Sequence, residues 1–192
     1  DLKFTLLDDN NAMLKGYNNG ELDFIENLPV DEIPTYLASG ELEIGDYLGT
    51  YYVCFNTEDE VFSDPNIRKA FSLVIDRNYI VENVSQAGEV PADGYVPNGV
   101  NDAAGAGSDD FRTVGGSYYS ISDEDYEANC EEARQLLADA GYPNGEGFPT
   151  VEYLYNTADN HKKIGEALQN MWQTELGVTV NLNRSEERRV GK

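Results

Sequence analysis

The stretch Tyr47–Arg77, YLGTYYVCFNTEDEVFSDPNIRKAFSLVIDR, predicts a strand, a short connection and a helix. Aromatic and β-branched residues dominate Tyr51–Asn56, and their alternation predicts a strand whose odd-numbered side chains share one face. Asp64 then stands where an N-cap belongs, and Pro65 at the first helical position, where its missing N–H costs nothing. The apolar stripe of this helix comprises Ile67, Ala70, Phe71, Val74 and Ile75. By itself, the pattern is typical of a strand and its covering helix in any α/β domain.

A β-α-β pattern precedes this stretch. Leu2–Leu7 is a short apolar strand, Asp8–Asn19 has helical apolar spacing with Gly20 just past its end, and Glu21–Ile25 predicts a second strand. A helical connection favours a parallel strand pair. Val30–Ser39 is a short helix at best, because Pro34 is expected to break it.

A second β-α-β pattern closes the chain. Ser122 is the predicted cap of one helix, and Val151–Tyr155 is a strand. A longer helix follows and ends before Gly177, and Val178–Leu182 is the second strand. Between the two β-α-β patterns, Asn78–Ala87 continues helically, and the Gly-, Ala-, Ser- and Asp-rich segment 101–116 predicts a surface loop.

The charge of the chain limits its partners. The 192 residues carry 13 Lys and Arg against 36 Asp and Glu, a formal net charge of −23. Nucleic acids and polybasic membrane contacts both require clustered Lys and Arg, so the charge argues against both. A solvated acidic surface is the simplest explanation, and a weak preference for cationic ligands is the alternative. The length allows one sizeable core or two smaller units.

No catalytic or metal-binding motif is present in the sequence. Cys54 and Cys130 form no CxxC or Cys/His spacing, so a zinc site is not expected. The GSDD segment, Gly107–Asp110, lacks the ligand spacing of an EF-hand. His161 is the only histidine and has no Ser or Cys partner in a recognisable motif. The sequence therefore indicates no enzyme, no metal and no cofactor.

Several blocks of this sequence resemble the extracellular solute-binding proteins of family 5, the oligopeptide and dipeptide receptors of ABC importers. The matching blocks are LGTYY…FN (48–56), D-x-x-x-R-x-A…DR (64–77), PA-x-G-x-VP (91–97), EEARQLLADAGYPNGEGFP (131–149), LYNTADNHKKI (154–164) and MWQTELGVTVNL (171–182). The resemblance implies an α/β, periplasmic-binding-protein-like fold of two lobes, of the class with an extra domain. Because the chain starts in mid-pattern, we interpret it as an internal fragment that carries only part of this fold.

The resemblance also implies a division into domains. Residues 1–46 are expected to be the C-terminal part of the first ligand-binding lobe, and residues 47–183 part of the second lobe. Residues 184–192, RSEERRVGK, have no apolar periodicity and depart from the family pattern. They match what a sequencing adapter encodes in frame, so we expect a non-native tail.

The implied function is to bind extracellular oligopeptides in an inter-lobe cleft and deliver them to a membrane permease. The site residues that the resemblance carries over are Tyr47, Tyr52, Cys54, Asn156, His161 and Asn27. Oligopeptide receptors can carry an acid where this chain has Cys54, which puts a preference for basic side chains in doubt. Core packing is the alternative role for both tyrosines, and a polar helix start for His161. The groups that hold the ligand's amino terminus are expected beyond Leu182.

Two other functions remain open at this point. A receptor of the same fold for an oligosaccharide or a nickel complex is the first alternative, and an extracellular hydrolase is a remote one. Sugar receptors stack rings on tryptophan, and the single Trp172 falls on a buried helical stripe, which favours peptide. The expected location is the extracellular face of the membrane or the periplasm, with membrane contact only through a lipid anchor outside this fragment.

Overall fold

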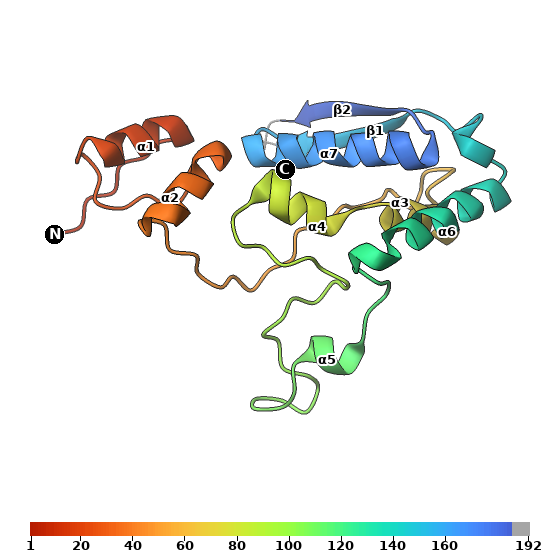
Figure 1. Cartoon of the computed structure of the whole chain (residues 1–192), viewed down its shortest axis with the longest axis horizontal. Coiled ribbons are helices and arrows are strands. Elements are labelled where there is room, and N and C mark those ends of the chain that lie inside the picture. The colour runs from red at the N-terminus through yellow and green to blue at the C-terminus, as the bar shows by residue number, and fades with distance from the viewer. Residues whose placement is uncertain (186–192) are drawn as a thin grey trace. The chain divides into compact units, whose positions relative to one another are not determined.

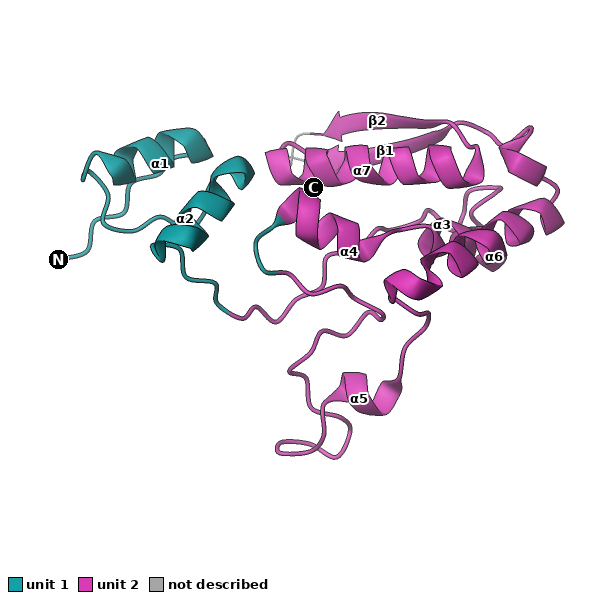
Figure 2. Cartoon of the chain, in the orientation of Figure 1, with its two compact units in different colours: residues 1–45, 86–88 teal, residues 46–85, 89–192 magenta. Residues whose placement is uncertain are grey.

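The computed structural model describes residues 1–185 and divides the chain into two compact units (Figure 1 and Figure 2). The first unit comprises residues 1–45 and 86–88, and the second comprises residues 46–85 and the chain from residue 89 onward. The assignment of these parts to two lobes stays a prediction. No helix among the described residues combines the length and hydropathy that a membrane span needs.

The first unit is built on two helices. The helix α1 (Asn10–Asn18) lies within the predicted range 8–19 and begins at Asn10, because the carboxylate of Asp9 accepts a hydrogen bond of 2.7 Å from the backbone N–H of Ala12. Gly20 follows the helix at φ +72°. The helix α2 (Ile33–Ser39) follows the 3-10 turn η1 (Val30–Glu32) and ends at the left-handed Gly40. Its Pro34 lies in the first turn, where no N–H is needed, so the predicted break is wrong.

The predicted strands of the first unit are absent from the structure. Residues 2–7 and 21–25 have no strand assignment, and Leu2, Phe4 and Leu6 are 90%, 87% and 96% exposed. An apolar segment becomes a strand only when another strand accepts its backbone hydrogen bonds. Residues 1–185 supply one such pair, β1 and β2, and both belong to the second unit.

The second unit contains the parallel pair and most of the helices. Its elements are α3 (Pro65–Leu73), α4 (Arg77–Tyr79), the π-helix η2 (Ile80–Ser85), α5 (Phe111–Gly115), η3 (Asp123–Asp125), α6 (Tyr126–Asp139), η4 (Pro143–Gly145), β1 (Val151–Asn156), α7 (Asp159–Leu176) and β2 (Val180–Ser185). The register runs from Val151 opposite Val180 to Asn156 opposite Ser185. The closing β-α-β pattern is thereby confirmed, with α7 alongside the strand pair (Figure 1).

This register extends β2 two residues into the predicted tail. Arg184 and Ser185, assigned from sequence to the tail, are the last residues of β2 and lie opposite Tyr155 and Asn156 of β1. They join the strand because β1 extends far enough to pair with them. The remainder of the predicted tail, residues 186–192, lies outside the described residues.

A single apolar cluster fills the second unit. It is made of Val61, Ile67, Ala70, Phe71, Leu73, Val74, Cys130, Ala133, Leu137, Ile164, Leu168, Trp172, Leu176, Val178 and Val180. The predicted stripe of α3 is confirmed, because it buries Phe71 completely and leaves only Ile75 partly exposed. The predicted cap is confirmed as well, since the Asp64 carboxylate accepts a hydrogen bond of 2.8 Å from the backbone N–H of Asn66.

The segment 51–56 differs from its prediction. It has no strand assignment, because no strand among the described residues pairs with it. Its alternation survives in part as a pattern of burial: Val53 and Phe55 pack against the core, whereas Cys54 and Asn56 face solvent. Tyr51, predicted to share the face of Val53 and Phe55, is 55% exposed and departs from the pattern.

Candidate functional site at the end of β1

Two of the predicted site residues meet where β1 ends. Asn156 is the last residue of β1, and His161 lies in the first turn of α7, which begins three residues later. The side-chain oxygen of Asn156 is hydrogen-bonded to Nδ1 of His161. An amide oxygen can only accept, so Nδ1 of His161 is the donor of this hydrogen bond. The carboxyl ends of parallel strands are common ligand sites in α/β folds.

Two tyrosines complete this cluster. The ring of Tyr51 lies 5.0 Å from the ring of His161 at an interplanar angle of 45°. The side chains of Tyr51 and Tyr153 interact with each other. Burial raises the pKa of both phenols above their ordinary value, and for Tyr153 the neighbouring Tyr51 adds to the rise. Both phenols are therefore neutral at pH 7 and serve as hydrogen-bonding groups rather than charges.

A second tyrosine pair lies on the same unit. The rings of Tyr52 and Tyr95 lie 5.0 Å apart at 66°, an edge-on contact. The hydrogen bond with Tyr95 is the main reason that the pKa of Tyr52 is raised, and the charges of Tyr95 and Cys54 add to it. Tyr52 is 53% exposed and Tyr95 60% exposed, and Cys54 is a free, exposed thiol.

The remaining predicted residues are not brought into these two groups. Tyr47 is 90% exposed, and its ring folds over Gly49, where a Cβ would lie only 2.5 Å from it. Asn27 is exposed and belongs to the first unit, whereas the other five residues belong to the second. The role of all six residues stays a prediction.

Three tyrosines of the two groups were not singled out from sequence as site residues. Tyr51 and Tyr153 stand in predicted strands, where alternation is equally consistent with burial in a core. Tyr95 occupies a variable position of the PA-x-G-x-VP block, so no motif marked it. Two sequence features could have pointed to these tyrosines. They are the aromatic composition of Tyr51–Phe55 and the Gly-Tyr pair at Gly94.

An open pocket of the second unit has a different location. An open pocket of about 700 Å³ is lined by Asp93 and residues 117–122, and none of the six predicted site residues lines it. The Asp93 carboxylate is occupied by Ser117 and Arg112, whose hydrogen bonds hold the pKa of Asp93 below its ordinary value. The acidic group of this pocket is therefore already engaged by neighbours in the same chain. Residues 1–185 contain no group of three His, Cys, Asp or Glu placed to hold a metal ion.

Comparison with known proteins decides the family. The family model of bacterial extracellular solute-binding proteins, family 5 (middle region), matches residues 1–191. This chain belongs to that family. Its expected fold class is thereby confirmed, as part of the α/β periplasmic-binding-protein fold. The family is one of receptors, which fits the interpretation of the chain as a non-enzyme.

Individual proteins similar to this chain support the same family assignment. The chain is 33% identical over 189 residues to the oligopeptide-binding protein OppA of Bacillus subtilis, covering 96% of this chain and 33% of that protein. It is 34% identical over 178 residues to the periplasmic oligopeptide-binding protein OppA of Salmonella typhimurium, covering 88% and 30%. The solved structure of the Escherichia coli murein tripeptide binding protein MppA matches with a TM-score of 0.75 and 32% identity, covering 92% and 33%. The chain thus spans about a third of the length of these relatives.

Proposed function

We propose that this chain is part of the substrate-binding component of an ABC importer, which captures oligopeptides outside the cell membrane and delivers them to a permease. The names of the OppA and MppA relatives support a peptide ligand. In this proposal residues 1–46 belong to one ligand-binding lobe and residues 47–183 to the other. The complete receptor works at the outer face of the membrane or in the periplasm, held by a lipid anchor that is encoded elsewhere.

The observation that carries the proposal is the grouping of Asn156, His161 and Tyr51 at the carboxyl end of β1. A peptide offers backbone donors and acceptors at every residue, whatever its side chains. An amide, an imidazole and a phenol match those groups without selecting one sequence. The half-exposed Tyr52 of the same unit offers a further apolar ring face.

The structure offers less to the alternative ligands. Trp172, the only tryptophan, is 1% exposed and donates its indole N–H to the backbone carbonyl of Phe71 at 2.8 Å, so it is not available to stack on a sugar ring. A protein-ligated nickel would need several His, Cys, Asp or Glu side chains, and the described part of the chain holds no group of three. Both facts favour a peptide.

Calorimetric titration tests the proposal. The complete receptor is titrated with a mixed pool of tri- to pentapeptides, beside its Tyr52→Ala and Asn156→Ala variants and the 192-residue chain alone. Loss of an aromatic contact or of a hydrogen bond is expected to weaken binding by roughly threefold to tenfold. Tyr79→Ala removes a half-exposed tyrosine of α4 and is the matched control.

The chain alone is expected to show no measurable binding, because two-lobed receptors bind by closing both walls over the ligand. Failure of the complete receptor to bind any peptide would overturn the proposed function. Tight binding by the 192-residue chain would show that the site is complete within it and that the cleft between two lobes is not required.

A further inference from the structure

We infer that Tyr95 is a further ligand-contacting residue, which forms with Tyr52 one aromatic wall that contacts apolar side chains of the bound peptide. The inference rests on the proposed function and deepens it, because it adds a preference among peptides. Tyr52 and Tyr95 come from separate segments, and their rings meet edge-on at a centroid distance of 5.0 Å. The two rings therefore form a single surface rather than two independent side chains.

The exposure of this pair separates it from the packing aromatics. Phe71 and Trp172, which build the core, are 0% and 1% exposed, whereas Tyr52 and Tyr95 are 53% and 60% exposed. A tyrosine pair that served only packing would bury its apolar ring faces. Aromatic side chains with both an apolar face and a polar tip are the ones that binding surfaces favour.

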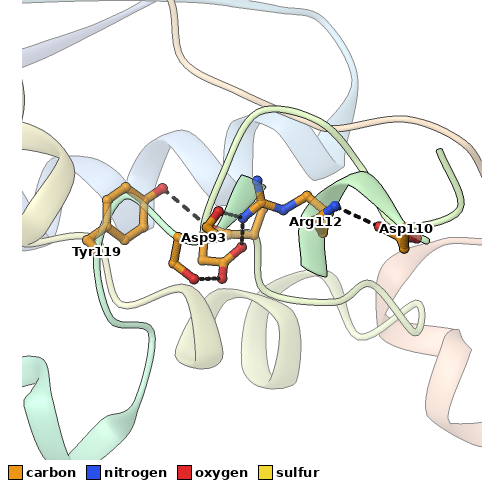
Figure 3. Close-up of polar contacts among 7 residues, drawn as sticks. Asp93, Asp110, Arg112 and Tyr119 are labelled. Carbon is orange, nitrogen blue, oxygen red and sulfur yellow. Dashed lines mark hydrogen bonds and ion pairs between the residues drawn. The ribbon is translucent and has the colours of Figure 1, made fainter. Parts of the chain in front are cut away.

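The backbone that carries Tyr95 is fixed from several sides. The Arg112 guanidinium, 11% exposed, forms an ion pair with the carboxylate of Asp93, which also accepts from the hydroxyl of Ser117 (Figure 3). Arg112 donates a further hydrogen bond of 2.9 Å to the carbonyl of Gly116. The Tyr119 hydroxyl donates to the carbonyl of Ala92 at 3.3 Å.

Gly94, the residue before Tyr95, packs directly on this guanidinium. A Cβ at position 94 would lie 2.5 Å from Cζ of Arg112, so a larger residue would displace either the arginine or the turn. The helix α5 holds Arg112 in turn, since its cap residue Asp110 accepts from the backbone N–H groups of Arg112 at 2.8 Å and of Gly99 at 2.6 Å. Arg112 is thus a positioning residue for Tyr95. A ring held in place before the ligand arrives loses little conformational entropy on binding.

The chemistry of the wall selects its ligand group. Tyrosine rings attract apolar and aromatic side chains, and Cys54 beside Tyr52 is a thiol where an acid would have attracted a basic side chain. The wall therefore favours a phenylalanine or a similar side chain over a small one. Because tyrosine rings are neutral, the preference is independent of the charge of the chain.

The test uses the complete receptor and four defined probes, trialanine and its three single-phenylalanine variants. Tyr95→Ala is expected to weaken the binding of at least one phenylalanine peptide by roughly threefold to tenfold, and to change trialanine less. Tyr95→Phe keeps the ring and is expected to retain most of the affinity. Tyr79→Ala is the control, and melting temperatures of all variants establish that they are folded.

A double-mutant cycle checks that the two rings act together. For that phenylalanine peptide, the effects of Tyr52→Ala and Tyr95→Ala are expected to be non-additive, since residues in contact couple. Additive effects, or losses with Tyr95→Ala no larger for any phenylalanine peptide than for trialanine, would overturn the inference while peptide binding itself stands. Absence of binding by the unsubstituted receptor would instead overturn the proposed function, and this inference with it.

Discussion

The indole N–H of Trp172 donates a hydrogen bond of 2.8 Å to the backbone carbonyl of Phe71, across 101 positions of sequence. The carbonyl lies in the last turn of α3, where helices leave acceptors without an intrahelical partner. The two rings also pack at a centroid distance of 5.5 Å. Trp172 of α7 thus caps the end of α3 and packs in the core against it. This one side chain joins two helices of the second unit that lie far apart in the sequence.

Trp172→Phe should destabilise the second unit by about 1–3 kcal/mol, because the Phe71 carbonyl stays buried without its donor. Urea unfolding of the 192-residue chain, followed by circular dichroism, measures the change. Tyr79→Phe, which alters an exposed ring, should leave the midpoint in place. An unchanged midpoint and slope for Trp172→Phe would show that the hydrogen bond contributes nothing to stability.

Asp64→Ala should cost about 1 kcal/mol, since it removes the acceptor of the first free N–H of α3. Glu58, an exposed acidic residue six positions earlier in the chain, provides the matched control. Glu58→Ala also removes one negative charge but removes no helix cap. Equal midpoints for the two variants in urea would mean that Asp64 acts only through its charge.

Burial raises the pKa of the Cys130 thiol to about 11 from an ordinary value of 9.0. Between these pH values the unfolded thiol releases its proton while the folded one keeps it, so stability falls as the pH rises from 9 to 11. Cys130→Ala should show a smaller fall over the same window. Tyr153, whose pKa burial also raises, remains in both proteins and cancels in the comparison. The pKa of Tyr126 is raised by burial and by its hydrogen bond with Cys130, so the variant reduces this rise too, which lessens the fall in stability in the same direction. Parallel pH profiles of the two proteins would contradict a buried thiol.

The sequence predicts the helices of this chain better than its strands, for a physical reason. A helix such as α3 or α7 satisfies its own hydrogen bonds, so its cap and its apolar period suffice to define it. The segments 2–7, 21–25 and 51–56 carry strand patterns but no partner strand within the described residues. Among the described residues, only β1 and β2, which pair with each other, form as predicted.

The candidate site likewise contains one contact that local sequence predicts and one that it does not. Asn156 and His161 are close in sequence, on a strand end and a helix start, so their contact follows from local structure. The contact between Tyr52 and Tyr95 depends on how a loop without periodicity is held by Arg112 and Asp93. No local pattern encodes such a contact, which is why the sequence did not indicate Tyr95.

Deletion of residues 186–192 should change the free energy of unfolding by no more than ~0.5 kcal/mol, the usual range for changes on a featureless surface. The deletion begins after Ser185, because Arg184 and Ser185 belong to β2. A longer deletion from Arg184 removes the pairing opposite Tyr155 and Asn156 and should cost more. Thermal unfolding distinguishes the two, and a clear loss of stability with the shorter deletion would argue that the tail is native structure.

The rate at which Cys54 reacts with a maleimide, with and without saturating peptide, tests the location of the site most directly. Cys54 is exposed beside Tyr52, whereas Cys130 is fully buried and serves as an internal standard for unfolding. Mass spectrometry of the digested complete receptor reads each cysteine separately. The account predicts that a peptide that binds by calorimetry slows the labelling of Cys54 and leaves Cys130 unlabelled throughout. An unchanged rate at Cys54 under saturating peptide would contradict it, because the ligand would then bind away from this surface.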